Sequence, residues 1–153
     1  SDLLYFAVRG EGAYLADAPS VSGFERARRL SISDCHLSET LAVFGSDPYH
    51  KSHTADITLR GARILLEHSL DIRRSGSAAL DLAYVASGCY GIYFENCVSP
   101  WDYAAGRLIV TEAGGVVTRV DGSVMPIAEV TTILAGAPTA CKEFLSFMEK
   151  TEK

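Results

Sequence analysis

One stretch of this sequence constrains the fold more than any other, because it contains the signals for a helix start, a helix body and a helix stop. It runs from Ser99 to Gly115 and reads S-P-W-D-Y-A-A-G-R-L-I-V-T-E-A-G-G. Ser99 suits the N-cap, and Pro100 suits the first helical position, where no backbone N–H is needed. Gly114-Gly115 supplies the left-handed residue that ends a helix. The stretch therefore predicts a helix that begins at Pro100 and stops at the glycine pair.

The body of this helix is apolar on most sides. Leu108, Ile109 and Val110 fall on consecutive faces, so we expect the helix to be buried. Asp102 falls at the third helical position, where a carboxylate faces unpaired amides and the positive end of the helix dipole. From spacing alone, a helix cap is the commoner role for such a residue. The alternative is a metal ligand at the helix N-terminus.

Length and composition limit the classes of protein to consider. The 153 residues suit one domain with a substantial core. Apolar residues make up 48% and charged residues 22%, without a low-complexity tract, as is usual for a globular protein. The net charge of −5 argues against a nucleic-acid partner. No apolar run approaches the roughly 20 residues that a membrane-spanning helix needs, so a membrane partner is not expected either.

The four cysteines are Cys35, Cys89, Cys97 and Cys141. No pair has C-x-x-C spacing, so the sequence does not predict a zinc site. We interpret the cysteines as reduced thiols of a cytoplasmic protein. The first residues lead straight into strand-like sequence rather than into a signal peptide, which agrees with that localisation.

Hydrophobic periodicity and turn signals predict an α/β chain. Strands are predicted at 3–8, 13–15, 29–33, 40–44, 91–96, 115–120 and 133–136, with a short strand or connection at 71–74. Helices are predicted at 55–69, 78–87, from 100 to the glycine pair, and from 138 onward. Residues 9–12 form the turn of a hairpin. Leu59, Ala62, Leu65 and Leu66 share one face of the helix at 55–69, which we expect to pack inward.

Two further groups of polar residues lie at the ends of predicted elements. Gly76 and Ser77 precede the helix at 78–87, where free amides can bind an anion or where Ser77 can simply cap the helix. Glu95 lies near the carboxyl end of a strand, seven residues before Asp102, where α/β sheets bind ligands. The alternative for Glu95 is an ordinary surface carboxylate.

Three segments together resemble the inositol monophosphatase family of Mg²⁺-dependent phosphatases. The first is the W-D-x-A-A-G-x-L-I-V-x-E-A-G-G stretch that begins at Trp101. The second is residues 73–88, which resemble the family pattern R-x-x-G-[ST]-A-A-x-x-x-x-x-V-A-x-G. The third is the hairpin pattern A-x-x-G-x-G-A-[FY], which begins at Ala7. The family usually continues with Asn-Gly where this chain has Ala16-Asp17, followed by a longer polar loop to about Arg29.

The resemblance implies a fold and a role for each of these positions. The fold would be a mixed, largely parallel sheet with helices on both faces and an N-terminal β-hairpin, as in the C-terminal lobe of the sugar-phosphatase sandwich. Asp102 would be a ligand of Mg²⁺, and Glu95 would accept hydrogen bonds from inositol hydroxyls. Gly76, Ser77 and Ala78 would contact the substrate's ring hydroxyls and phosphate side. The substrate would be a sugar or inositol phosphate.

The resemblance covers only the second half of the family pattern. The Glu-Glu motif and the D-P-[ILV]-D-G-T motif, which supply most metal ligands, are absent, and Asp47-Pro48 continues as Tyr-His. We expect residues 1–34 to belong to the family's first sheet and residues 35–153 to form the C-terminal lobe of a single α/β domain. The chain would then be a truncation, the product of a split gene or a degenerate paralogue.

Two consequences follow from the missing motifs. A single carboxylate should bind Mg²⁺ weakly, so we expect very low or no phosphatase activity from this chain alone. The first hairpin would leave strand edges exposed, so we expect a homodimer that covers them. Two other functions remain open: another branch of the superfamily, such as a bisphosphate nucleotidase or fructose bisphosphatase, and a non-catalytic module that oligomerises or binds a partner. Glu95 and the G-S-A-A-L-D-L-A-Y run favour the inositol branch.

Overall fold

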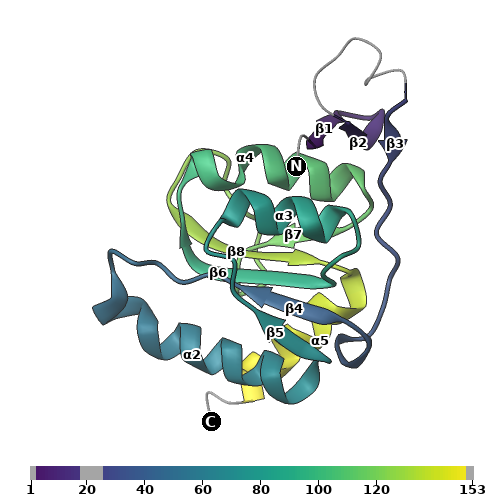
Figure 1. The fold of residues 1–153 in the computed structure, drawn as a ribbon. Coiled ribbons are helices and arrows are strands. Elements are labelled where there is room, and N and C mark those ends of the chain that lie inside the picture. Colours follow the sequence, from purple (N-terminus) through teal and green to yellow (C-terminus); the bar gives the residue numbers. More distant parts are fainter. Residues whose placement is uncertain (1–2, 18–25, 151–153) are drawn as a thin grey trace.

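A computed structural model describes residues 3–17 and 26–150, which form two β-sheets and the helices that cover them (Figure 1). An antiparallel sheet with strand order β1-β2-β3 consists of β1 (Leu3–Val8), β2 (Gly12–Asp17) and β3 (Arg28–Arg29). A second sheet with strand order β5-β4-β6-β8-β7 consists of β4 (Leu41–Phe44), β5 (Asp71–Arg73), β6 (Ile92–Val98), β7 (Val116–Thr118) and β8 (Thr131–Gly136). The helices are α2 (Lys51–His68), α3 (Ala78–Ala86), α4 (Pro100–Glu112) and α5 (Pro138–Lys150), with a 3₁₀ turn η1 (Leu37–Glu39).

The five-stranded sheet is mixed, as the sequence predicted. β4 pairs in parallel with both β5 and β6, whereas β8 pairs antiparallel with β6 and β7. The sheet is therefore less parallel than expected. The reason lies in the connection between β7 and β8, which contains no crossover helix, and a parallel pair needs such a crossover.

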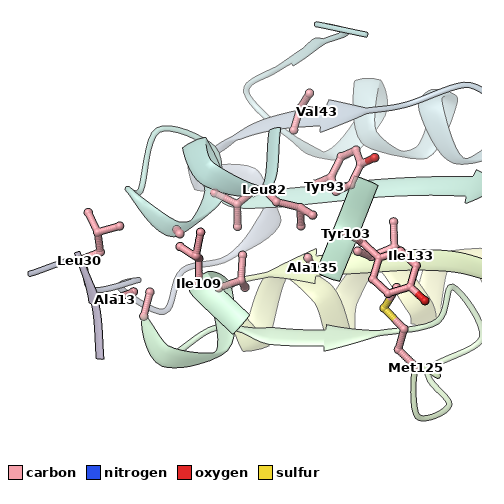
Figure 2. Close-up of a cluster of buried hydrophobic side chains, with 14 of the residues drawn as sticks. Ala13, Leu30, Val43, Leu82, Tyr93, Tyr103, Ile109, Met125, Ile133 and Ala135 are labelled. Atoms are coloured by element: carbon pink, nitrogen blue, oxygen red, sulfur yellow. The ribbon is translucent and has the colours of Figure 1, made fainter. Parts of the chain in front are cut away.

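Helices cover both faces of this sheet (Figure 1). α3 and α4 lie on the face towards the N-terminal sheet, and α2 and α5 lie on the opposite face. Each face has its own cluster of buried side chains. In the first cluster Leu82, Tyr93, Tyr103 and Ile133 are buried, and Ala13 of the hairpin joins them (Figure 2). The mixed sheet, its two helical layers and the N-terminal hairpin confirm the predicted α/β class.

α4 matches its predicted boundaries closely. Ser99 is the N-cap, Pro100 is the first helical residue and Ala113 is the C-cap. Gly114 follows with φ of 90°, a left-handed conformation that glycine adopts without strain. Local capping signals were therefore sufficient to place this helix.

The hairpin is held to the end of α4 by one carboxylate. Glu112 accepts hydrogen bonds from the amides of Gly10 and Gly12, at 2.9 and 3.1 Å, through its two oxygens. Both ends of the turn between β1 and β2 are therefore attached to the last residue of the helix.

The predicted strand at 29–33 is shorter than expected. Its ladder with β2 ends at Arg29, after which the amide of Leu30 donates to Ala13 O and the amide of Ile32 donates to Ala113 O. The Leu30 amide thus still bonds to β2, whereas the Ile32 amide bonds to the C-cap of α4, so the chain passes from the sheet to the end of that helix. The strand predicted at 13–15 is longer than expected, since β2 continues to Asp17, and residues 18–25 of the predicted polar loop lie outside the described residues.

α2 differs from its prediction in its start and in its buried face. The helix begins at Lys51 rather than near residue 55, and Leu59 and Leu66 are 65% and 57% exposed. The face that packs on the sheet includes Gly61, where an added Cβ would lie 2.4 Å from the Phe94 ring. The absence of a side chain there brings the helix close to β6, and this close approach decides which face is buried.

The cysteines and the helices can be compared with what the sequence predicted. All four cysteines are free thiols, as expected. Among the helices of residues 3–17 and 26–150, none is both long enough and apolar enough to cross a membrane. The division of the chain at residue 34 stays a prediction.

Candidate functional site

A cavity of about 560 Å³ lies at the carboxyl ends of β4 and β6. These two strands are parallel neighbours, so their carboxyl ends meet at one edge of the sheet, where α/β folds bind ligands. The wall includes residues that follow β4, the start of α3, the end of β6 and the start of α4: Gly45, Asp47, His50, Gly76, Ala78, Glu95, Cys97, Trp101 and Asp102. The cavity thus brings together four of the five predicted site residues, and Ser77 lies beside it.

Asp102 serves as a helix cap and also faces the cavity. Its Oδ2 accepts a hydrogen bond of 3.1 Å from the amide of Ser99, and its own amide donates to Ser99 O at 2.9 Å. The side chain is half-buried and lines the cavity. Because a carboxylate has two oxygens and about four acceptor positions, the cap leaves capacity for a cation. The two roles that the sequence left open are therefore compatible.

Glu95 is buried at the floor of the cavity, which excludes the surface-residue alternative. The Tyr93 hydroxyl donates to Glu95 Oε2 at 2.5 Å. Phe44 pairs with Phe94, so Gly45 comes directly beside Glu95, and an added Cβ at position 45 would lie 1.9 Å from Oε2. Only a glycine at position 45 leaves room for this carboxylate. Gly45 is thus a site residue that the sequence analysis missed, although a glycine just after a strand was a visible signal.

The carboxylates around the cavity affect one another. Burial raises the pKa of Glu95, and the charges of Asp102, Asp81 and Asp47 raise it further, against the lowering effect of the Tyr93 hydrogen bond. Burial also raises the pKa of the Cys97 thiol to about 11, with the same direction of effect from neighbouring carboxylates. Asp47 is the exception, because hydrogen bonds to its carboxylate outweigh burial and lower its pKa. A cavity with these shifts favours the entry of a cation.

Asp81 is a further buried carboxyl group that the sequence analysis did not identify. It lies within α3, is 1% exposed, and neither oxygen has a hydrogen-bond partner. Burial raises the pKa of Asp81, while Ser75 and Arg74 lie near enough to lower it in part. The carboxyl group of Asp81 raises the pKa of both Tyr93 and Glu95, so it lies close to these two residues. No local pattern predicts this burial, because the residue falls inside an otherwise apolar helix.

The start of α3 is built as a helix cap. Ser77 Oγ accepts from the amide of Leu80 at 3.4 Å, and the Ser77 amide donates to Ser75 Oγ at 3.0 Å. Gly76 has φ of 85° and lines the cavity together with Ala78. The capping role proposed as an alternative for Ser77 is therefore observed. Binding of an anion by the Ser77 amide would have to replace its bond to Ser75.

The donor set fits Mg²⁺ only in part. Mg²⁺ prefers oxygen ligands in octahedral geometry, usually one or two carboxylates completed by water and substrate phosphate. Asp102 offers such an oxygen at the cavity wall, and Glu95 and Asp47 are further carboxylates that line the cavity. Asp102 is the residue that would hold the ion, and the other carboxylates would increase its attraction. Among the described residues, no Glu-Glu or D-P-x-D-G-T motif adds ligands from elsewhere.

Comparison with known proteins agrees with this geometry. A model of the inositol monophosphatase family matches residues 1–149. The chain belongs to the inositol monophosphatase family. The Nus factor SuhB of Escherichia coli (strain K12) is 38% identical over 145 residues, which are 95% of this chain and 50% of that protein. An inositol-1-monophosphatase of Mesorhizobium japonicum is 33% identical over 150 residues, which are 97% of this chain and 52% of that protein.

A solved structure of a relative confirms the fold. The inositol monophosphatase of Anabaena (Nostoc) sp. PCC 7120 has a TM-score of 0.81 and 34% sequence identity over 97% of this chain and 54% of that chain. The chain thus spans about half the length of the relatives it matches, and corresponds to their C-terminal portion. The family contains Mg²⁺-dependent phosphatases. The roles of the individual site residues stay predictions.

Proposed function

We propose that this chain forms the substrate-binding half of an inositol monophosphatase-like phosphomonoesterase, with an inositol phosphate as substrate and inositol and phosphate as products. The supporting observation is the cavity that combines Glu95, Asp102 and the start of α3 at one sheet edge. The names of relatives among inositol monophosphatases agree with this proposal. Because a single carboxylate of the chain faces a metal position, the chain alone has very low or no activity.

In this proposal, different residues of the cavity contact different parts of the substrate. Glu95, when ionised, is an acceptor without a donor and therefore suits the hydroxyl groups of a polyol. Its raised pKa reflects its burial beside the cavity. Gly76 and Ala78 leave room for the ring, since neither has a long side chain. The Tyr93 hydroxyl fixes one Glu95 oxygen in place, so the carboxylate is oriented before substrate arrives.

Asp102 is the residue through which this half contributes to phosphate chemistry. Its position at the third residue of α4 is fixed by the bond from the Ser99 amide, so it would hold an ion in a defined place. A bound Mg²⁺ would supply charge neutralisation of the phosphate oxygens and activation of water. In this proposal the metal would bind on the α4 side of the cavity and the substrate hydroxyls on the β6 side.

The proposal is tested by phosphate release from inositol 1-phosphate, with and without Mg²⁺, by the chain alone and after addition of the N-terminal half of a relative. We expect little or no release by the chain alone and Mg²⁺-dependent release after the addition. Asp102→Asn should abolish the restored activity, whereas Asp56→Asn, an exposed carboxylate on α2, should not. Robust Mg²⁺-dependent turnover by the chain alone would contradict the expected low activity. Failure of the added half to restore any turnover would count against the phosphatase function.

A substrate panel tests the choice of inositol phosphate. A bisphosphate nucleotide and fructose bisphosphate represent the other branches of the superfamily. The restored enzyme should hydrolyse inositol 1-phosphate most efficiently, and Glu95→Gln should raise KM for it more than for a phosphate ester without neighbouring hydroxyls. A preference for a bisphosphate would move the chain to another branch.

A non-catalytic, partner-binding role is the second candidate. It is favoured by apolar side chains at the cavity mouth, where Trp101 and Val130 are 81% and 61% exposed. A relative known as a Nus factor is consistent with such a role. We also propose that the chain forms a homodimer through the N-terminal sheet, whose edge strands offer unpaired backbone groups. Light scattering at high concentration tests this, and a strictly monomeric species contradicts it.

A further inference from the structure

Three side chains with different ligand chemistry meet at the rim of the cavity. Asp47, His50 and Cys97 each place one ligand atom so that all three atoms lie within 4.8 Å of one another. All three residues also line the cavity. A carboxylate, an imidazole and a thiol in one cluster form a mixed set that zinc and similar ions bind.

Two of the three residues are held in place by the backbone. Asp47 comes shortly after β4 and is 5% exposed, and its Oδ1 accepts from the amide of Tyr49 at 2.8 Å. Cys97 belongs to β6, which has an irregular register with β8 between Glu95 and Val98. Such irregularities redirect side chains near functional sites. The bulged segment contributes both Glu95 and Cys97 to the cavity.

His50 completes the cluster from the start of α2. Its Nδ1 lies 2.5 Å from Asp47 Oδ2, and 64% of its side chain is exposed. A tetrahedral ion with ligands at about 2.0–2.3 Å separates those ligands by roughly 3.3–3.8 Å. The Asp47–His50 contact must therefore open by about 1 Å to admit an ion. His50 can make this adjustment because it is exposed, while the other two residues stay in place.

We propose that Asp47, His50 and Cys97 form a binding site for a zinc-type divalent ion at the rim of the substrate cavity. The absence of C-x-x-C spacing argued against a zinc site, but the fold assembles one from residues 47 and 50 and a single distant cysteine. Three protein ligands leave a fourth tetrahedral position, and because all three residues line the cavity, that position is open to a molecule within it.

This site differs from the proposed Mg²⁺ position in chemistry and in residues. Mg²⁺ prefers oxygen ligands and requires octahedral geometry, so a thiol and an imidazole exclude it in favour of Zn²⁺, Co²⁺ or Cd²⁺. Asp102 is not a member of the cluster. The site goes beyond the proposed phosphatase function and does not depend on it.

Cobalt substitution tests the site directly, because a thiolate bound to Co²⁺ gives a charge-transfer absorption band in the near ultraviolet. The probe is Co²⁺ added to the reduced, metal-free full chain, followed by competition with Zn²⁺ and with excess Mg²⁺. We expect the band to appear, to be removed by Zn²⁺ and to persist in Mg²⁺. Cys97→Ser should abolish the band, and the matched control Cys89→Ser, an exposed cysteine outside the cavity, should retain it.

Two further variants test whether His50 is a ligand and whether this site is independent of the proposed Mg²⁺ position at Asp102. His50→Ala should weaken Co²⁺ binding by more than the roughly 10–100-fold typical of residues that only orient a ligand. Because His50 is exposed, its substitution should leave the circular dichroism spectrum unchanged. Asp102→Asn should retain the band, so loss of phosphatase function and loss of this site are distinguishable. No band in the wild type, a band that persists in Cys97→Ser, or unchanged affinity in His50→Ala would overturn the proposal.

Discussion

The two sheets of this chain are stabilised in different ways. The five-stranded sheet has helices and a buried cluster on each face, so its central strand β6 is buried along almost its whole length. In the three-stranded sheet, no residue of β1 is fully buried, and Leu3 and Val8 are each 44% exposed. Its connection to the rest of the chain depends on packing against α4 and on the hydrogen bonds of Glu112. The candidate site thus lies on the five-stranded sheet, which is stabilised by a buried cluster on each face.

Substitution of one phenylalanine in each region gives the sharpest test of this difference. Phe144 on α5 is completely buried against Phe94, whereas Phe6 on β1 is half-buried and stacks on Tyr14. Phe144→Ala should cost about 3–5 kcal/mol of unfolding free energy, because it removes a core side chain and leaves a cavity. Phe6→Ala should cost about 1–2 kcal/mol, since it loses a cross-strand pair and partial burial. Urea denaturation of both variants measures the difference, and equal losses would refute it.

Removal of the carboxylate that joins the hairpin to α4 should have a smaller and more local effect. Glu112→Ala leaves the amides of Gly10 and Gly12 without their acceptors. We expect a loss of about 1–2 kcal/mol, as for hydrogen bonds to a partly exposed charged group. Amide hydrogen exchange should become faster in residues 3–17 and stay unchanged in β6. Glu149→Ala, at an exposed position on α5, is the matched control. Faster exchange in both sheets would mean that they unfold as one unit.

At the edge of the five-stranded sheet that lines the cavity, ionisation of Glu95 should lower the free energy of unfolding by an amount that depends on pH. The raised pKa of Glu95 means that the folded state binds its proton more tightly than the unfolded state does. At pH values below the pKa of Glu95 in the unfolded chain, both states are protonated and the free energy of unfolding is unaffected. As pH rises from there through the pKa of Glu95 in the folded chain, ionisation lowers the free energy of unfolding. In the absence of metal ions, Glu95→Gln should match the wild type near pH 4 and exceed its stability by on the order of 1 kcal/mol at neutral pH.

Thermal unfolding between pH 4 and 8 measures this effect as a rise in Tm of about 2–4 °C for Glu95→Gln at neutral pH. Glu129→Gln, at an exposed position before β8, is the control and should leave Tm unchanged at every pH. A Glu95→Gln variant that is less stable than the wild type at neutral pH would show that the ionised carboxylate supports the fold. The expectation that ionised Glu95 at the cavity destabilises the fold, whereas Glu129 has no effect, would then be wrong.

Local signals made part of this fold predictable. The start and end of α4 follow from Ser99-Pro100 and from the glycine pair, and the hairpin follows from the glycines at 10 and 12. These elements depend on residues within a few positions of one another. The face of α2 could not be predicted in the same way, because Gly61 becomes the contact point only when Phe94 is beside it. Leu59 and Leu66 consequently face solvent although their spacing suggested a core.

The candidate site shows the same limit more clearly. Glu95 and Asp102 were identified because their positions match a family pattern, and the cavity contains both. Asp47 indicated only a turn, yet it is buried beside His50 and Cys97. Asp81 carried no signal, because its burial arises from the packing of α3 on the sheet and on α4. Burial of a polar residue by distant segments is a property of the assembled fold and not of the local sequence.

The thirteen residues of α4 connect the two regions mechanically. Asp102 lies in the first turn of the helix, at the cavity, and Glu112 is its last residue, at the hairpin, so about 15 Å of helix separates the two residues. A helix of this length behaves as a rigid rod under small forces. Because one helix carries both carboxylates, a displacement of α4 along its axis would shift Asp102 and the acceptor of the β1–β2 turn together. The candidate metal-binding carboxylate and the attachment point of the N-terminal sheet are thus two ends of a single rigid element.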